Sequence, residues 1–315
     1  MKRYTLFLLG LAALLQPVLA DSFYSSVGLG MPKYFVSPKA SGMGGAGIGV
    51  SEFMTMNVMN PAANDIRYAT CLGVQFEFEL INNSSTISEV STRNGNAAGM
   101  QFMFPLKTNV AFISYLRPLT VSRYILEATQ SEGQVPYTQT ITGNGGLSTA
   151  GLGLQYIYRE RISIASVINF NFGSVNESWN LSFSSDEYVD AADKFNSHFS
   201  GASVDLGLLV KPVNKLSLGL VYKGSADLLQ RTDIIYGSGY TFKQEDGHII
   251  YPQAWGGGMS LALNKLTLAL DYFHQQWSRY EVNGRSRDDF KDFNRLSAGV
   301  EYLRSSKTTD RYSHR

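Results

Sequence analysis

Leucine alternates with small or polar residues in several segments of this 315-residue chain. At residues 215–222 and again at residues 265–272, every second position is apolar. Successive side chains of a β-strand point to opposite faces, so each segment predicts a strand with one apolar face and one small or polar face. Many such strands in one chain favour an all-β, up-and-down transmembrane barrel whose outer face meets lipid.

The N-terminus predicts export. A basic start precedes an apolar run over residues 6–15, and residues 18–20 have the small side chains of a cleavage site. We therefore expect a signal peptide over residues 1–20, whose removal leaves Asp21 as the first residue. A retained anchor helix is the alternative, but the apolar run is shorter than the ~20 residues that a bilayer span needs. No cysteine follows the site, so a lipoprotein anchor is not expected.

Composition excludes several classes of protein. Hydrophobic residues make up 44% of the chain, and no second long apolar run follows the first, which argues against a helical membrane protein. The net charge of +1 gives no electrostatic reason to expect nucleic acid as a partner. Cys71 is the one cysteine, so no internal disulfide can form.

The alternation predicts ten strands joined in turn by short and long connections. Short turns are expected near residues 106, 160, 213 and 264. Long polar connections are expected at residues 81–97, 118–147, 173–199, 224–251 and 276–292. Such a sequence of connections is typical of a barrel with periplasmic turns and exterior loops. Residues 179–183 and 234–236 indicate that some strands continue above the membrane as hairpins.

The strand at residues 110–116 is the least regular, because Ile113 and Tyr115 are large on the face expected to be small or polar. Aromatic girdles are expected where the strands leave the bilayer. Tyr222 and Tyr272 fall near the outer edge and Tyr158 and Tyr302 near the inner edge.

A secreted soluble β-sandwich is the alternative fold. Its strands also alternate, but its connections need not alternate in length. Heat-modifiable migration on a detergent gel, which a soluble sandwich lacks, distinguishes the two.

The inner face of the predicted wall is polar. The residues expected to face the lumen are Gln75, Glu77, Glu79, Asn169, Asn171, Asp205, Asp271 and Glu301. They limit how apolar a path through the lumen can be, and they favour a route that leaves sideways through the wall.

A glycine-rich segment, residues 41–53, precedes the first predicted strand. Its glycines include Gly42, Gly44, Gly45 and Gly47. The spacing matches a dinucleotide fingerprint, but no strand precedes it and no βαβ unit follows, so nucleotide binding is rejected and no cofactor is expected. Small residues here allow tight turns inside a confined lumen. Three methionines follow, at Met54, Met56 and Met59, for which packing within a plug is favoured over ligand contact.

Catalysis has little support in the sequence. The four histidines are far apart and have no metal-ligand spacing. His274 with Asp271 and Ser278 is the one cluster that could suit a nucleophile, and alternation places its members on different faces. Acidic pairs in the long connections are expected to be solvated surface. We therefore expect no enzyme activity.

A family resemblance rests on two features. The glycine-rich run leads to Asn60, Pro61 and Ala62, and residues 276–280 read Gln-Trp-Ser-Arg-Tyr after a strand. In this order of parts the chain resembles the FadL/TodX family of outer-membrane transporters for hydrophobic compounds. Members have a fourteen-stranded barrel plugged by an N-terminal hatch that carries an Asn-Pro-Ala motif. The resemblance implies a hatch at residues 21–67 and a barrel at residues 68–315.

The resemblance also implies a function. Long-chain fatty acids or aromatic hydrocarbons would be taken up passively, pass the hatch as it rearranges, and exit laterally. The implied partners are the outer-membrane bilayer, the hydrophobic ligand and the machinery that assembles outer-membrane barrels. The alternative is a non-transporting barrel of the same build that holds a partner protein, as in a secretion system.

The end of the chain departs from the family. After Tyr302 the residues are polar, and the last one is Arg315 rather than the aromatic residue that usually ends such barrels. Bacterial barrels close with an even number of strands. Our hypothesis is that this chain is truncated and lacks about four closing strands, as a fourteen-stranded relative implies.

Overall fold

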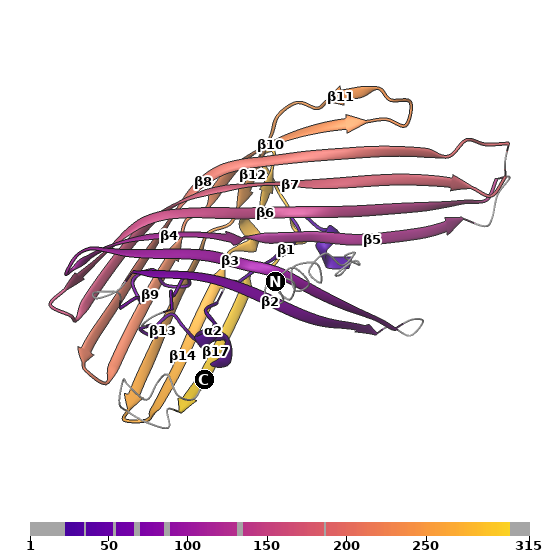
Figure 1. Ribbon diagram of the computed structural model, residues 1–315. Coiled ribbons are helices and arrows are strands. Elements are labelled where there is room, and N and C mark those ends of the chain that lie inside the picture. The colour runs from indigo at the N-terminus through magenta and orange to yellow at the C-terminus, as the bar shows by residue number, and fades with distance from the viewer. Residues whose placement is uncertain are drawn as a thin grey trace, which may run out of the picture.

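The structure is a computed structural model that describes residues 23–34, 36–52, 55–65, 70–84, 89–130, 135–185 and 187–302. Most of these residues belong to antiparallel strands that curl into a barrel wall (Figure 1). The expected signal peptide and the polar C-terminal tail lie outside the described residues. Within the described ranges, no helix is both long and apolar enough to cross a membrane.

The wall is built from long strands and shorter continuations of them. They are β2 (Cys71–Ser84), β3 (Glu89–Lys107), β4 (Val110–Pro118), β5 (Thr120–Gln130), β6 (Tyr137–Tyr158), β7 (Ile162–Phe183), β8 (Ala191–Val213), β9 (Leu216–Lys223), β10 (Ala226–Ile235), β11 (Thr241–Lys243), β12 (Gly247–Tyr251), β13 (Ala254–Leu263), β14 (Leu266–Gln275), β15 (Glu281–Val282), β16 (Arg285–Ser286) and β17 (Phe293–Tyr302).

Several of these elements continue one another along a single pass of the chain. β6 pairs with both β4 and β5, and β8 pairs with both β9 and β10. Likewise, β12 pairs with β10 and β13 pairs with β9. Within the described residues the chain therefore makes ten long passes, from β2 to β17, which agrees with the ten strands predicted.

The two ends of the barrel differ. At one end the strands join through two- or three-residue turns, at 108–109, 159–161, 214–215 and 264–265, close to the predicted positions. At the other end, β5 to β8 and β10 extend far beyond the rest of the wall, toward the right of Figure 1. We call the outer parts of these strands the blade: residues 120–130, 137–147, 173–183, 191–200 and 226–235.

The blade corrects one prediction. The long connections expected at residues 81–97, 118–147, 173–199 and 224–251 are strand over most of their length, so this correction extends beyond the blade. Ladder hydrogen bonds need no apolar face, so polar segments rich in Ser, Thr and Asn can remain strands beyond the bilayer. The hairpin extensions expected at residues 179–183 and 234–236 are strand for all but the last residue, Tyr236.

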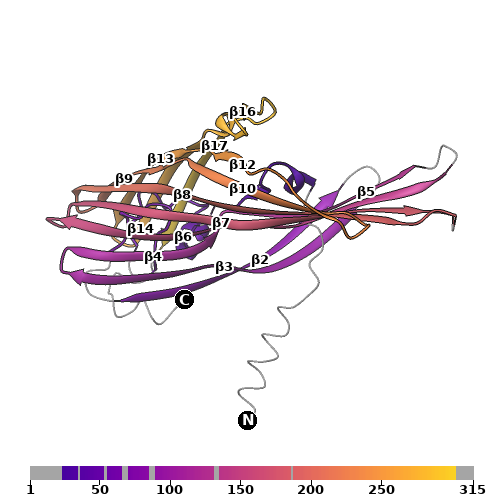
Figure 2. The ribbon, with the colours of Figure 1, turned by 90° about the horizontal axis from the view of Figure 1, so that it is seen from above.

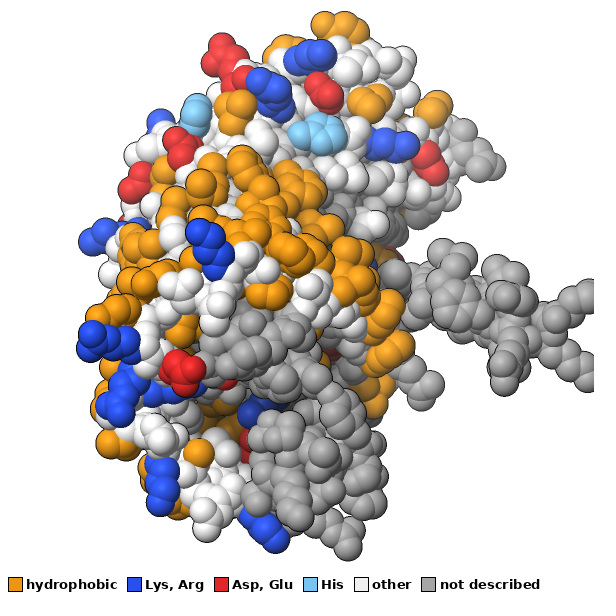
Figure 3. All heavy atoms as spheres, turned by 60° about the vertical axis from the view of Figure 1, so that its left-hand side comes forward, with side chains coloured by type: hydrophobic (Ala, Val, Ile, Leu, Met, Phe, Trp, Pro, Cys, Tyr) orange, Lys and Arg blue, Asp and Glu red, His pale blue; other side chains and the backbone are white. Residues whose placement is uncertain are grey.

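An apolar band covers the outer face of the wall. Figure 3 shows hydrophobic side chains gathered over it, and on β7 the exposed side chains include Ile162, Ile164, Ile168, Phe170 and Phe172. The ten steps from Ile162 to Phe172 span roughly 34 Å of strand, or about 25 Å when the strand is tilted as in transmembrane barrels. The band therefore matches the hydrocarbon thickness that such barrels cross.

Aromatic residues border this band on both sides. Tyr222 pairs in register with Trp255, whose ring lies 5.6 Å from that of Tyr272, and all three are exposed. Tyr158 and Tyr302 lie beside the short turns. The girdle positions expected from the sequence are thus occupied as predicted.

The N-terminal segment runs inside the barrel (Figure 2). It contains the 3₁₀ helix η1 (Phe23–Ser26), the short strand β1 (Met31–Pro32) and helix α2 (Pro38–Gly42). Ser37 caps α2, because its Oγ accepts a hydrogen bond from the Ala40 N–H at 3.1 Å, and Pro38 occupies the first helical turn. We call described residues 23–65 the hatch.

Candidate functional site: the hatch contacts and the lumen cavity

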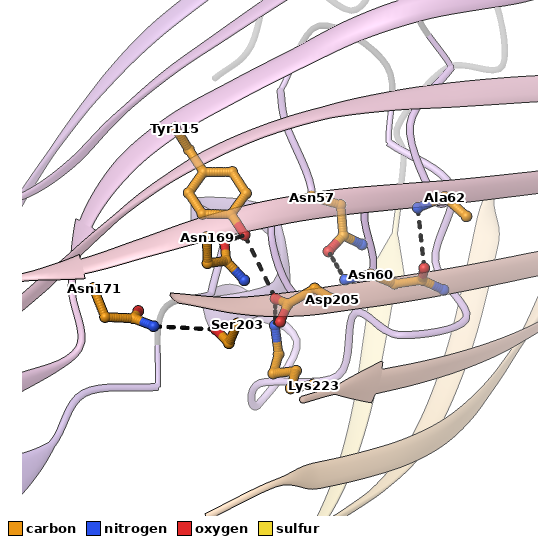
Figure 4. Close-up of polar contacts among 9 residues, drawn as sticks. All are labelled: Asn57, Asn60, Ala62, Tyr115, Asn169, Asn171, Ser203, Asp205 and Lys223. Carbon is orange, nitrogen blue, oxygen red and sulfur yellow. Dashed lines mark hydrogen bonds and ion pairs between the residues drawn. The ribbon is translucent and has the colours of Figure 1, made fainter. Parts of the chain in front are cut away.

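Asn60 joins three parts of the molecule. It is fully buried, and its Nδ2 donates to the Ile48 carbonyl at 2.8 Å and to the Leu208 carbonyl on β8 at 3.1 Å. Its Oδ1 accepts a hydrogen bond from the Ala62 N–H at 3.1 Å (Figure 4). One amide thus connects the glycine-rich run, the barrel wall and the Asn-Pro-Ala turn.

Two further asparagines, which the sequence analysis missed, complete this arrangement. Asn57 Nδ2 donates to the Gly47 carbonyl at 2.6 Å, and the Asn57 N–H donates to Asn64 Oδ1 at 2.6 Å. Asn64 Nδ2 donates to the Pro61 carbonyl at 2.9 Å. The signal was their spacing of three and four residues around Asn60, since short amide side chains favour bonds to nearby backbone.

Glycines of the wall let the hatch backbone approach closely. A Cβ added to Gly219 would lie 2.0 Å from the Ile48 carbonyl oxygen, and one on Gly207 would lie 2.5 Å from Asn60 Oδ1. In the same way, a Cβ added to Gly258 would lie 2.7 Å from the Gly49 nitrogen, and one on Gly299 would lie 2.2 Å from the Met43 carbonyl oxygen. We call Gly207, Gly219, Gly258 and Gly299 the glycine seat.

The predicted hatch glycines differ in how strongly the structure requires them. Gly44 and Gly45 have φ of +63° and +83°, the left-handed conformation that favours glycine. A Cβ on Gly47 would lie 2.9 Å from that of Ala40. Gly42 has open space beside it. Tight turning therefore accounts for two of the four and close packing for a third.

Asp271, the cross-strand neighbour of Gly258, also holds the glycine-rich run. Its Oδ2 accepts hydrogen bonds from the N–H groups of Gly47 and Ile48, at 2.5 and 2.6 Å. The carboxylate is buried and lies inside the barrel. His274 is bonded instead to Asn294, at 2.8 Å, so His274 and Asp271 do not form a catalytic pair.

Four other predicted lumen residues contact the hatch. Lys33 forms ion pairs with Glu79 at 2.5 Å and with Glu77 at 3.8 Å. Two further contacts are Glu301 with Lys39, at 3.0 Å, and Gln75 Nε2 with the Val36 carbonyl, at 3.2 Å.

Two of the remaining three, Asn169 and Asp205, lie in a polar network on β4, β7, β8 and β9 (Figure 4). The Tyr115 hydroxyl donates to Asn169 Oδ1 at 2.7 Å and lies 3.5 Å from Asp205. Lys223 forms an ion pair with Asp205 at 2.9 Å. Next to this network, Asn171 Nδ2 donates to the Ser203 hydroxyl at 3.1 Å.

A cavity that is partly open to solvent lies between this network and the hatch, and its empty space, including the open part, is about 720 Å³. The apolar part of its lining includes Ile48, Met59, Leu119, Tyr251 and Phe273. Met59 thus contributes to the cavity, whereas Met56 packs in the core between hatch and wall. Met54 lies outside the described residues. The cavity is amphipathic, because the rest of its lining is polar or charged.

Arg117 and Thr149 form the most polar part of the cavity wall. They are cross-strand neighbours on β4 and β6, with exposed fractions of only 8% and 1%. Within the described residues, Arg117 Nε and Thr149 Oγ1 have no hydrogen-bond partner. Both atoms are fully covered in this state, and because buried polar groups are nearly always satisfied, they are available to an acceptor on a ligand once a local rearrangement uncovers them. Neither residue was predicted from the sequence.

The cavity lining has more positive than negative charge. Its cations are Lys33, Arg117, Lys223 and Arg295, and its one carboxylate is Asp205. Lys33 and Lys223 have carboxylate partners, but no described carboxylate forms an ion pair with Arg117 or Arg295. Arg295 lies over the rings of Tyr34 and Phe273, 5.7 and 5.5 Å from their centroids.

The connection between β14 and β17 carries a cluster of aromatic residues beside the cavity. We call this connection, residues 276–292, the roof. It begins with the 3₁₀ helix η2 (Trp277–Arg279), and Trp277 lies 5.4 Å from Tyr251 of the cavity wall. Tyr280 and Phe290 pack together, with ring centroids 4.7 Å apart. Burial raises the pKa of Tyr280 to about 12. The Gln-Trp-Ser-Arg-Tyr sequence therefore forms part of this roof.

Comparison with known proteins decides the family. The BamG family model matches residues 3–315. The chain belongs to the BamG family. No curated protein matches this BamG-family chain in sequence.

Solved structures show that this BamG-family chain shares a fold with FadL-type proteins. A Pseudomonas aeruginosa FadL homologue has a TM-score of 0.57 at 11% identity, covering 86% of this chain and 77% of its own. The toluene transporter TodX of P. putida has a TM-score of 0.54 at 16% identity, and the match covers 84% of this chain and 79% of TodX. TbuX, the toluene transporter of Ralstonia pickettii, has a TM-score of 0.51 at 13% identity, and the match covers 85% of this chain and 79% of TbuX. The resemblance and the all-β barrel class predicted from the sequence are confirmed.

Proposed function

We propose that this chain is an outer-membrane passive transporter for hydrophobic small molecules that carry an anionic head group, with long-chain fatty acids as the favoured class. The observation that carries the proposal is the amphipathic cavity. Its apolar lining residues suit an acyl chain, and Arg117 with Thr149 supplies two buried polar atoms without a partner among the described residues.

The chemistry of these donors distinguishes between the two substrate classes. A carboxylate could accept hydrogen bonds from both groups, and such charge-assisted bonds are stronger than neutral ones. An aromatic hydrocarbon would leave both donors unsatisfied, and an unsatisfied buried group costs about 1–3 kcal/mol. The cavity therefore favours a fatty acid over toluene-like molecules.

The proposed route requires the hatch to move. The Asn60, Pro61 and Ala62 turn and the glycine-rich run lie against the inner face of the wall at Leu208 and Gly219, and on the proposed route ligand passes them when they rearrange. These contacts are hydrogen bonds and ion pairs, which can be exchanged without breaking covalent bonds. Exit sideways into the bilayer avoids the polar groups at residues 75, 77, 79 and 301. A cleaved signal peptide and insertion by the barrel assembly machinery belong to the same proposal.

Uptake of labelled long-chain fatty acid and of labelled toluene tests the proposal. Cells with the protein should take up more fatty acid than cells without it. Arg117→Met should lower fatty-acid uptake about tenfold, because a hydrogen bond to a charged group contributes about 1.5–3 kcal/mol. Lys243→Met on β11, an exposed cation far from the cavity lining, is the matched control and should have no effect. Equal uptake with and without the protein would contradict the proposal.

A second candidate is a barrel that holds a partner protein and does not transport. It is supported by exposed apolar side chains that gather on two outer hairpins beyond the membrane band: Tyr188 and Val189 on one, and Tyr236, Tyr240 and Phe242 on the other. Large exposed apolar surfaces mark interaction sites. Unchanged fatty-acid uptake in cells lacking the protein, together with loss of an exported partner, would favour this function.

A further inference from the structure

Positive charge collects at the short turns of the barrel. Five exposed cations lie at the four turns: Lys107, Arg159, Arg161, Lys215 and Lys265. We call them the turn ring. Glu160 is the one acidic residue of these turns. Figure 3, in which the short-turn end comes forward, shows Lys and Arg side chains spaced along this edge below the apolar band.

The turn ring is poor in internal counter-ions. Among the described residues, no ion pair involves Lys107, Arg159, Lys215 or Lys265. Some cations of the blade and the outer loops are paired, namely Arg231 with Asp246 and Arg287 with Asp289, whereas these four are not. The charge of the turn ring is therefore free for an external anion.

The ring lies at the edge of the apolar band. Each turn has an exposed apolar neighbour: Leu106, Tyr158, Val213 and Leu263. The Arg159 guanidinium lies over the ring of Tyr158, 5.1 Å from its centroid. Long cationic side chains lie along apolar surface and extend their charged ends to the interface. This geometry directs Arg159 toward the bilayer surface rather than toward the lumen.

The opposite edge of the band carries neutral partners instead. The Tyr222 hydroxyl donates to Gln253 Oε1 at 2.8 Å, and the Tyr272 hydroxyl donates to Asn294 Oδ1 at 2.7 Å. Both partners are amides. At these two positions the aromatic side chains of the opposite edge are therefore bonded to neutral groups, unlike Tyr158 beside Arg159.

We propose that the turn ring binds the phosphate groups of anionic phospholipids, such as phosphatidylglycerol, in the leaflet beside the short turns. The cations are distributed along the curved wall at one level, next to lipid-facing side chains. A layer of head groups surrounding the barrel fits this distribution, whereas one acidic protein would be matched by a compact patch. Basic residues near a membrane surface are attracted to anionic lipids. This inference does not depend on the proposed transport.

Lipid association with the reconstituted full chain tests the ring. The protein is placed in phosphatidylcholine bilayers with a trace of spin-labelled phosphatidylglycerol or phosphatidylcholine, and electron paramagnetic resonance measures the fraction of each held at the protein. We expect about threefold preference for the anionic lipid, weakened by high salt. The variant Lys107→Gln, Arg159→Gln, Lys215→Gln and Lys265→Gln should lose the preference.

A matched variant controls for net charge. Lys194→Gln, Lys243→Gln, Arg285→Gln and Lys291→Gln removes the same number and type of exposed cations from the blade and the outer loops, and it should keep the preference. Heat-modifiable migration checks that each variant is folded. Equal association of both lipids with the parent, or an unchanged preference in the folded turn variant, would overturn the proposal. A polyglutamate peptide that binds the parent but not the turn variant, without any lipid preference, would overturn it in favour of an acidic protein partner.

Discussion

The hatch meets the barrel wall in two different ways. At the glycine seat the wall has no side chains, and backbone lies against backbone, with Asn60 satisfied at both ends of its amide. At the cavity the wall has long polar side chains, and Arg117 and Thr149 keep polar atoms without a partner among the described residues. The satisfied contacts at the glycine seat fix the position of the hatch, whereas the unsatisfied polar atoms at the cavity leave room for a ligand. The two regions should therefore respond to substitution in opposite ways.

The largest effect is expected at the glycine seat. Gly219→Ala places a methyl group where the Ile48 carbonyl now lies, so either the hatch or the strand must shift. Overpacking of this kind costs about 1–3 kcal/mol, and contact with backbone favours the upper end. Thermal unfolding in detergent and protease cleavage within residues 36–52 measure the loss of stability and the release of the hatch.

Gly257→Ala is the control for this change. It lies one residue from the seat glycine Gly258, and an added Cβ would be 3.5 Å from its nearest neighbour, Leu220. It should leave both stability and protease resistance unchanged. If Gly219→Ala also leaves them unchanged, the glycine seat does not hold the hatch.

A smaller loss is expected for Asn60→Ala. The change leaves the carbonyls of Ile48 and Leu208 and the N–H of Ala62 without this partner. Unsatisfied buried groups predict destabilisation by about 2 kcal/mol. Asn176→Ala, on an exposed part of β7, is the control and should stay within about 0.5 kcal/mol of the parent. Equal losses of stability for the two substitutions would contradict the role of the Asn60 side chain in holding the hatch to the wall.

Thr149→Val, at the cavity, should not lower the stability of the protein, whereas the substitutions at the glycine seat and at Asn60 should. It removes a buried hydroxyl that has no partner in the described residues, so stability should stay the same or rise by about 1 kcal/mol, while fatty-acid binding weakens. Thr120→Val is the control. Its hydroxyl donates to the Leu29 carbonyl at 2.6 Å and accepts from the Leu147 N–H at 3.1 Å, so about 1–2 kcal/mol should be lost. Similar losses for both variants would contradict the role of Thr149.

The barrel wall was predictable from sequence because its cause is local. Lipid on one side imposes a period of two, which can be counted residue by residue. The irregular strand at residues 110–116 has a physical explanation: Ile113 and Tyr115 face inward and pack with the hatch residues Met56 and Ala62, so both faces of β4 are apolar. A strand buried on both faces loses its alternation.

The cavity was not predictable in the same way. Alternation assigns Arg117 and Thr149 to the inner face, but it does not say whether a polar group there finds a partner. That depends on where the hatch lies, and the hatch is positioned by contacts across more than a hundred residues, such as Asn60 with Leu208. The glycine seat had a weak signal, because Gly207, Gly219 and Gly258 all lie on inward-facing positions of regular strands.

The smallest predicted effect concerns the roof beside the cavity. Asp292 accepts a hydrogen bond from the Ser278 N–H at 2.9 Å, and the hydrogen bonds from Ser278 lower the pKa of this carboxyl. A carboxyl whose folded pKa is lowered stabilises the fold above its ordinary pKa of about 4, and the contribution is lost as the pH falls through the lower folded value. The start of η2 should therefore loosen below about pH 4. Fluorescence of Trp277, with Trp179→Phe and Trp255→Phe as background, measures this change.

Asp292→Asn distinguishes this carboxyl from the other acidic groups of the roof. The amide keeps an oxygen that can accept from Ser278 but does not titrate in this range, so the fluorescence should vary less with pH than in the parent. Asp289, whose pKa is lowered by its hydrogen bond with Arg287, remains in both proteins. An identical pH profile for the two would assign the change to Asp289, and the roof would then be held at its second half rather than at Ser278.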